Sequence, residues 1–282
     1  MIIKEVLKLA VDKLKLNNIE DASIKAKILL AEVLGKEKEY LLIHDQEEIK
    51  DNDMLIFMSW IERLEKEEPL QYILNKQEFM GLQFFVDENV LIPQPDTENL
   101  VEEVIMLSEN IKTENDKIKI LDMCTGSGAI AISLAKYLKE SLVYASDISI
   151  EALKIAEENA TRNLTSVVFF ESDMFNNISS EFQFDIIVSN PPYIETEIVK
   201  TLSKEVQAEP IIALDGGEDG LKFYREIIKN AKDYLKVDGY LAFEIGYNQK
   251  HSVMDLLKEN GYKNVYSKKD LSGNDRVVIG QK

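Results

Sequence analysis

Apolar residues recur at intervals of three and four positions through the first seventy residues, which is the spacing of amphipathic helices. The helices predicted from this pattern span residues 2–14, 22–33, 40–43 and 54–64. Asp21 stands where it could cap the second helix, and Gly35 follows that helix as a stop signal. The stretch holds no recognisable set of catalytic residues. Residues 1–72 are therefore predicted to form a small helical domain that docks a substrate or partner.

The pattern changes after Pro69. Two short apolar segments flank Gly81, which predicts a β-hairpin within a linker of residues 73–89. An extended Pro93-Gln94-Pro95 segment follows and leads into a helix that we expect Asp96 or Thr97 to cap. Because this segment comes just before the first strand of the next domain, it is placed to line the mouth of a site.

From residue 118 onward, short apolar runs alternate with amphipathic helical segments, which is typical of a mostly parallel sheet in an α/β fold. Strands are predicted at residues 118–122, 142–146, 167–170, 184–189 and 240–245, and helices at 129–138, 150–163, 221–235 and 249–260. Residues 265–267 and 276–279 predict a closing hairpin-like pair. Residues 194–220 show no regular pattern, and a long irregular loop in a compact domain is often a lid.

A glycine loop follows the first predicted strand. It runs from Asp122 through Cys124, Thr125, Gly126, Ser127 and Gly128 into a helix. Asp147 ends the next strand about 20 residues further on, where a carboxylate can accept hydrogen bonds from a ribose diol. This arrangement indicates an adenosine-containing cofactor, and the loop also fits the dinucleotide pattern G-x-G-x-x-A. S-adenosylmethionine is favoured because Asp122 is placed to orient an ammonium group and because of the motif that ends the fourth strand.

That motif is Asn190-Pro191-Pro192-Tyr193, at the carboxyl end of a buried strand where ligands bind in open α/β sheets. The Asn190 side-chain oxygen and the Pro191 carbonyl can accept both hydrogens of a planar amino group, and Tyr193 can stack on the group that carries it. The motif therefore predicts a cradle for an amide or an aromatic amine. The alternative is a plain turn, because Asn-Pro marks turns.

Composition and charge narrow the classes of function. The 282 residues are 45% hydrophobic, which suffices for one large or two ordinary domains. No apolar run is long enough to span a membrane, and the N-terminus lacks a signal-peptide pattern, so we expect a cytoplasmic protein. One cysteine and two histidines argue against a disulfide or a clustered metal site, and we expect no metal. The net charge of −18 argues against direct nucleic-acid binding.

The motifs in combination resemble a known family. The glycine loop, Asp147 and Asn-Pro-Pro-Tyr together resemble S-adenosylmethionine-dependent amino-methyltransferases. Three further segments are similar to the protein-glutamine methyltransferases of peptide-chain release factors, and the resemblance covers essentially the whole chain. These segments are residues 91–98 (Leu-Ile-Pro-Gln-Pro-Asp-Thr-Glu), Glu209-Pro210, and residues 273–276 (Gly-Asn-Asp-Arg).

The resemblance implies a Rossmann-like class I methyltransferase domain over residues 90–282, with a mostly parallel seven-stranded sheet. It implies a monomer that methylates the glutamine of the Gly-Gly-Gln motif of release factors. The implied cofactor-binding residues are Cys124 to Gly128, Asp147, Asp173, Met174 and Asn190. Asn190, Pro191, Pro192 and Tyr193 are the implied catalytic and substrate-binding residues.

Two departures from the family pattern stand out. Cys124 occupies a position where the family has glycine, so we expect that this position does not need the backbone freedom of glycine. Gln94 replaces an arginine. A nucleic-acid amino-methyltransferase that acts on DNA adenine or ribosomal RNA guanine is the main alternative, since Asn-Pro-Pro-Tyr alone is shared with that class. A non-catalytic binding protein that kept the fold is a second alternative.

Overall fold

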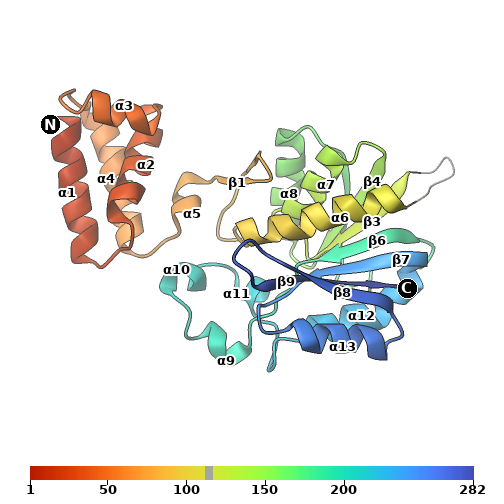
Figure 1. Ribbon diagram of the computed structural model, residues 1–282. Helices are drawn as coiled ribbons and strands as arrows, with labels where there is room; N and C mark the ends of the chain where they lie inside the picture. Colours follow the sequence, from red (N-terminus) through yellow and green to blue (C-terminus); the bar gives the residue numbers. More distant parts are fainter. Residues whose placement is uncertain (112–116) are drawn as a thin grey trace. The chain divides into compact units, whose positions relative to one another are not determined.

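The computed structural model describes residues 1–111 and 117–282, and they form two compact units (Figure 1). The first unit comprises Met1–Asn75 and Ser203–Ala208, and the second comprises Lys76–Leu202 and Glu209–Lys282. The predicted linker of residues 73–89 divides between them, because its hairpin belongs to the second unit.

The first unit is a bundle of short helices around an apolar core. Its helices are α1 (Ile3–Leu16), α2 (Ala22–Leu34), α3 (Lys38–Ile43), α4 (Asp51–Glu65) and α5 (Leu70–Leu74). Gly35 ends α2 in the left-handed conformation, with φ +61°, as predicted. The predicted cap at Asp21 is wrong, because its side chain makes no capping hydrogen bond. Its backbone is left-handed, with φ +52°, whereas a capping side chain reaches the helix from an extended backbone.

The short segment Ser203–Ala208 completes the first unit and contains α10 (Lys204–Gln207). Lys25 Nζ lies 3.3 Å from a Glu205 carboxylate oxygen, and Lys204 Nζ lies 3.1 Å from Glu67 Oε1. A part of the chain that lies far from the bundle in sequence is thus held to it by complementary charges.

The second unit is built on a seven-stranded, mostly parallel sheet in the order β5-β4-β3-β6-β7-β9-β8, which confirms the predicted fold class. Its strands are β3 (Ile118–Met123), β4 (Ser141–Asp147), β5 (Val167–Glu171), β6 (Phe184–Ser189), β7 (Leu235–Glu244), β8 (Lys263–Lys269) and β9 (Asp275–Gln281). Strand β9 inserts antiparallel between β7 and β8. The predicted closing pair is therefore part of the main sheet, and all six residues of the central strand β6 are buried.

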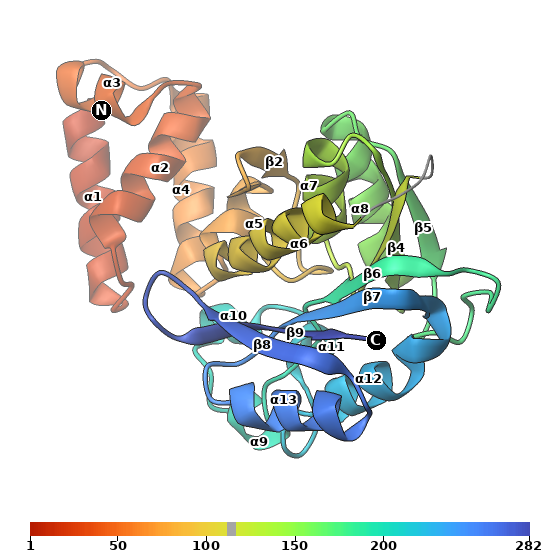
Figure 2. The ribbon, with the colours of Figure 1, turned by 45° about the vertical axis from the view of Figure 1, so that its right-hand side comes forward.

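Helices cover both faces of this sheet. On one face lie α6 (Glu98–Asn110), α7 (Ala129–Tyr137) and α8 (Ile150–Arg162), and on the other lie α12 (Lys222–Tyr234) and α13 (Lys250–Glu259) (Figures 1 and 2). The stretch 194–220 is less irregular than predicted. It holds α9 (Thr196–Val199) and α11 (Ile211–Leu214) besides α10, each only four residues long and too short to give a periodic signal.

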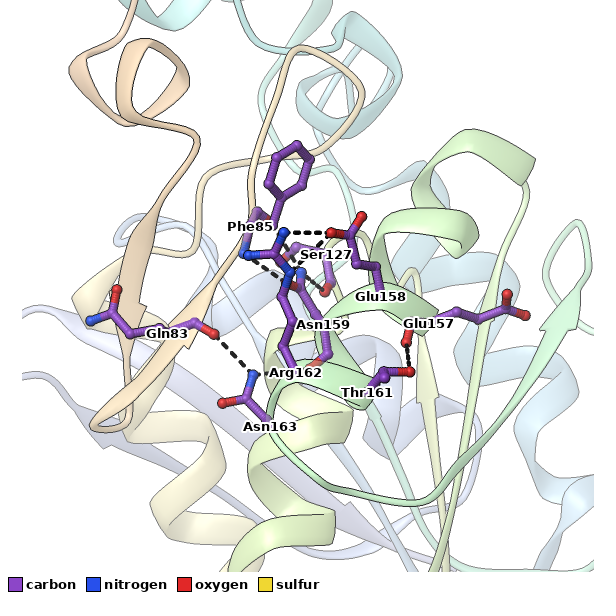
Figure 3. A network of polar contacts seen from close by, with 9 residues as sticks. All are labelled: Gln83, Phe85, Ser127, Glu157, Glu158, Asn159, Thr161, Arg162 and Asn163. Carbon is purple, nitrogen blue, oxygen red and sulfur yellow. Dashed lines mark hydrogen bonds and ion pairs between the residues drawn. The ribbon is translucent and has the colours of Figure 1, made fainter.

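The hairpin of β1 (Gln77–Phe79) and β2 (Leu82–Phe84) is fastened to α8 of the same unit (Figure 3). The buried Asn159 side chain accepts from Phe85 N at 2.7 Å and donates to Phe85 O and to Ser127 O, both at 3.0 Å. Asn163 Nδ2 donates to Gln83 O at 2.9 Å, and the Arg162 guanidinium lies over the Phe85 ring. One buried amide thus ties the hairpin to the glycine loop that follows β3.

Candidate active site

A cavity of about 290 Å³ lies in the second unit, at the carboxyl ends of its parallel strands. Its lining comes from Met123 at the end of β3, Asp147 at the end of β4, Asp173 and Met174 after β5, and Asn190 after β6. Ligands bind at this edge in open α/β sheets, and the volume is near the lower end of the roughly 300–1,000 Å³ of small-molecule sites. The cavity brings together residues that the sequence places in four separate segments.

The first wall is the loop between β3 and α7, which the fully buried Asp122 holds in shape. Asp122 Oδ2 accepts from Thr125 Oγ1 at 2.6 Å and from Ala131 N at 3.1 Å. Burial raises the pKa of this carboxyl to about 7, and no described residue bonds its Oδ1. Asp122 is not among the residues that line the cavity, and the contacts that it makes shape the loop.

Backbone geometry explains two positions of this loop. A Cβ at Gly128 would lie 2.8 Å from Ile132 Cδ1 and 3.1 Å from Ala156 Cβ, and φ is +82°, so glycine lets α7 pack against α8. Cys124 has φ +60°, and the expectation that this position does not need left-handed backbone is wrong. A residue with a Cβ costs about 1–2 kcal/mol in that conformation. Burial raises the pKa of the Cys124 thiol, so the sulfur stays protonated and is no nucleophile.

Asp147 joins the loop to the next strand. Its Oδ2 accepts from Gly126 N at 2.8 Å, and its Oδ1 accepts from Ser149 N at 2.9 Å. Burial raises the pKa of this carboxyl above its ordinary value, and these backbone hydrogen bonds act in the opposite direction. A carboxylate has about four lone-pair sites, so acceptor capacity remains for a hydroxyl donor from the cavity.

Asn190 lines the cavity directly after β6, which pairs with β3 on the side away from β4. Its Nδ2 donates to Thr97 Oγ1 at 3.4 Å, while its Oδ1 receives no hydrogen bond from the described residues. The expected cap of α6 is wrong for both candidates. Thr97 stands at the cap position, but its side chain makes no capping bond and meets Asn190 instead. Asp96 forms an ion pair with Arg276 at 3.0 Å.

The rest of the Asn-Pro-Pro-Tyr turn is held from outside the cavity. Pro192 lines the cavity, whereas Pro191 and Tyr193 do not. Gln249 Nε2 donates to Tyr193 O at 2.9 Å. A Cβ at Gly216 would come within 2.7 Å of the Tyr193 backbone, so only glycine allows the segment after α11 to approach the turn this closely.

Two of the family-like segments also act as supports of the site. Glu209 Oε2 accepts from Ile92 N at 2.8 Å, and Gln94 Nε2 donates to Ile92 O at 3.0 Å. Arg276 pairs with Asp96 and, at 3.2 Å, with the buried Asp270 of the β8–β9 turn. These contacts hold the Pro-x-Pro segment in place, and Gln94 stabilises that segment locally.

The predicted site residues thus fall into two groups. One group lines the cavity, namely Cys124, Gly126, Asp147, Asp173, Met174, Asn190 and Pro192. The other group is not part of the lining, namely Thr125, Ser127, Gly128, Pro191 and Tyr193. Other lining residues were not predicted, among them Ser149, Ile212, Lys222 and Phe223. Ser149 is the N-cap of α8, Ile212 belongs to α11, and Lys222 and Phe223 begin α12. No motif in the sequence marks these positions as parts of a site.

Comparisons with known proteins agree with this geometry. A family model described as "Methyltransferase small domain" matches residues 104–214, and one described as "PrmC N-terminal domain" matches residues 5–74. A release factor glutamine methyltransferase of Fusobacterium nucleatum is 43% identical over 99% of this chain and 78% of its own. A protein of the same description from Clostridium acetobutylicum is 43% identical over 99% of this chain and 98% of its own.

Among solved structures, a methyltransferase from Pyrococcus furiosus matches 72% of this chain and 90% of its own, with a TM-score of 0.54 and 21% identity. That likeness supports the fold of the second unit. In the described part of the chain, no helix is both long and apolar enough to cross a membrane.

Proposed function

This chain belongs to the family of release factor glutamine methyltransferases, and on that premise we propose that it methylates the glutamine of the Gly-Gly-Gln motif of peptide-chain release factors. The methyl group comes from S-adenosylmethionine and goes to the side-chain amide nitrogen. The observation that carries the proposal is that Asp147 and Asn190, one suited to a ribose and the other to an amide, line the same cavity.

The lining fits the cofactor. Asp147 keeps acceptor capacity for a ribose hydroxyl, with its position fixed by Gly126 N and Ser149 N. Asp173 and Met174 would border the adenine, and the loop from Cys124 to Gly128 would hold the methionine end. When bound, S-adenosylmethionine supplies a methyl group that its sulfonium makes electrophilic.

The Asn190 side chain provides orientation for the substrate. Because Nδ2 donates to Thr97, the acceptor oxygen Oδ1 is the atom left for an incoming N–H. The Pro191 carbonyl, next to Asn190 in the chain although outside the cavity lining, would take the second hydrogen of the glutamine amide. The two acceptors would then direct the nitrogen lone pair. Positioning of this kind contributes on the order of 7–11 kcal/mol at best. The two oxygens also stabilise the positive charge that develops on the nitrogen.

No strong base is needed. Once the amide nitrogen has accepted the methyl group, it carries a positive charge and is strongly acidic. It then loses one of its two protons to water. Tyr193 does not serve as a base at neutral pH, because burial raises the pKa of its hydroxyl further above its ordinary value.

We propose residues 1–72 as the docking domain for the release factor. A single glutamine side chain offers too few contacts to distinguish one protein substrate from others. Selectivity for the release factor must therefore come from contacts remote from the reacting amide. The first unit carries large apolar side chains that are at least 65% exposed, namely Leu16, Leu42, Ile43 and Leu55. Adjacent Leu42 and Ile43 of α3 offer apolar surface for a partner, whereas single exposed residues such as Leu16 and Leu55 are normal on any protein surface.

The test is transfer of a labelled methyl group from S-adenosylmethionine to a purified release factor, with total cellular nucleic acid as the competing acceptor. The proposal expects label in the release factor and none above background in nucleic acid. Label in nucleic acid alone would refute it and favour the nucleic-acid alternative. Absence of transfer to either acceptor, with the cofactor bound in a titration, would identify a binding protein.

A further inference from the structure

Gln249 is a buried amide that directly precedes α13 and contacts the main chain of the Asn-Pro-Pro-Tyr turn. The residue is 8% exposed, and its side chain makes no hydrogen bond that caps α13. Instead Oε1 accepts from Gly246 N at 3.0 Å, and Nε2 donates to Tyr193 O at 2.9 Å and to Gly220 O at 3.2 Å. One amide thus joins three segments of the second unit.

The two carbonyls that Gln249 holds belong to segments that pack very closely. A Cβ at Gly220 would lie 2.4 Å from Tyr193 O and 2.7 Å from Gln249 Nε2. A carbonyl confined in this way needs a donor, because a buried polar group without a partner is costly. The –NH2 group of Gln249 has two hydrogens and serves both carbonyls, whereas the amide turned over would set its oxygen against both.

The turn has few means of its own to fix its main chain, because its two prolines have no N–H to donate. The two acceptors of the proposed cradle also differ in kind. Asn190 offers a side-chain oxygen, whereas the Pro191 carbonyl is a main-chain atom. The position of that carbonyl depends on how the backbone of the turn is anchored, and the bond from Gln249 to Tyr193 O is an anchor two residues along.

We propose that Gln249 is a positioning residue that acts through Tyr193 O to hold the Pro191 carbonyl where it accepts from the substrate amide. The inference rests on the proposed function, because it concerns the same amide cradle. Gln249 is not part of the cavity lining, so it acts on the substrate through the turn. Misplacement of reacting groups by about 1 Å can cost about a hundredfold in rate, so a backbone anchor of this kind bears on turnover.

Two variants separate loss of the anchor from its reversal. Gln249→Met has a similar length and removes every hydrogen bond of the amide. Gln249→Glu keeps an acceptor for Gly246 N, but its ionised form places a charged oxygen against the two carbonyls. The matched control is Gln183→Met, because Gln183 Nε2 also donates to two backbone carbonyls, Asp233 O at 2.7 Å and Phe182 O at 3.1 Å. Gln183 directly precedes β6, whereas the turn follows that strand.

The experiment measures kcat and KM at saturating cofactor for intact release factor and for a Gly-Gly-Gln peptide. We expect Gln249→Met to lower kcat about ten- to a hundredfold on both substrates, with little change in KM for the release factor. The dissociation constant for S-adenosylmethionine should change much less than kcat, because Asp147 takes its hydrogen bonds from Gly126 and Ser149. Gln183→Met should keep the wild-type kcat.

The pH dependence of Gln249→Glu gives a readout that a merely structural role would not move. Burial raises the pKa of the introduced carboxyl, and its protonated form regains one O–H donor for a carbonyl. The ratio of its kcat to wild-type kcat should therefore rise as the pH falls from about 8 to about 6. The Tyr224 hydroxyl, 3.5 Å from Gln249 Oε1, stays protonated over this range because burial raises its pKa.

A kcat of Gln249→Met within a few-fold of the wild-type value would overturn the inference, and so would a kcat ratio of Gln249→Glu that does not change with pH. A dissociation constant for the cofactor that rises as much as kcat falls would overturn it too, since Gln249 would then shape the cofactor site. If Gln249→Met does not fold, the pH dependence of Gln249→Glu decides alone. If wild-type enzyme and Gln183→Met both leave the release factor unmethylated, the proposed function has failed and the inference falls with it.

Discussion

Asp147→Asn is the change that isolates cofactor binding most cleanly. The variant keeps the size of the side chain, but one of the two oxygens that accept from Gly126 N and Ser149 N becomes an amino group. At least one charge-assisted hydrogen bond to the ribose is lost, which costs about 1.5–3 kcal/mol. The dissociation constant for S-adenosylmethionine should therefore increase by about tenfold to more than a hundredfold.

Isothermal titration provides the measurement, and Asp219→Asn provides the control. Asp219 also accepts a backbone N–H two residues on, from Leu221, but it does not line the cavity. A second ligand separates ribose recognition from damage to the loop. S-adenosylhomocysteine and its 2′-deoxy analogue should differ in affinity for the wild-type protein and differ much less for Asp147→Asn.

An unchanged isotherm for Asp147→Asn would refute the ribose role. The same difference between the two ligands in wild-type and variant protein would refute it as well, because the lost affinity would then come from the loop.

Gly128→Ala should lower the free energy of unfolding by roughly 2–5 kcal/mol in urea titrations, because a Cβ would clash with α7 and α8 at a positive φ; an unchanged midpoint would contradict the packing argument. Asn159→Ala should cost about 2–4 kcal/mol, because three backbone groups lose their partner, and protection of the hairpin amides in hydrogen exchange should fall with it. As the pH rises from about 4 to about 7, the free energy of unfolding of the wild-type protein should fall relative to that of Asp122→Asn. The folded-state pKa of Asp122, about 7, exceeds its ordinary 3.8, so this carboxyl ionises at a lower pH in the unfolded chain than in the folded protein. Parallel plots of stability against pH for the two proteins would contradict this. A protein that lacks residues 1–72 should bind S-adenosylmethionine nearly normally but lose most activity on intact release factor while keeping weak activity on a Gly-Gly-Gln peptide; equal loss on protein and peptide would contradict the docking role.

Local sequence patterns were sufficient to predict most of the helices and strands of the second unit. The glycine loop and Asp147 could be placed at the sheet edge because strand, turn and helix signals are local, and parallel strands bring their carboxyl ends to one edge. The position of β9 between β7 and β8 is set by pairing over a distance in sequence, and no local pattern encodes it.

The errors at Cys124 and Thr97 have a common cause. The sequence suggests a favoured backbone for a cysteine and a favoured cap for a threonine, but contacts elsewhere in the fold override both preferences. Cys124 takes a left-handed backbone in the loop that lines the cavity, and Thr97 bonds Asn190, which lies far from it in sequence. Sequence reasoning missed Lys222 and Phe223 for a related reason, since they line the cavity from the first turn of α12 and no local motif marks that turn as part of a site.

The central claim is methylation of a glutamine amide in a cradle formed by Asn190, and mass spectrometry of one peptide tests it most directly. A release factor is incubated with S-adenosylmethionine and either wild-type enzyme or Asn190→Ala, and its Gly-Gly-Gln tryptic peptide is fragmented. The account predicts one added methyl group on the glutamine side chain with wild-type enzyme, and at least a hundredfold slower addition with the variant. A methyl group on another residue, or a variant rate within a few-fold of the wild-type rate, would contradict it.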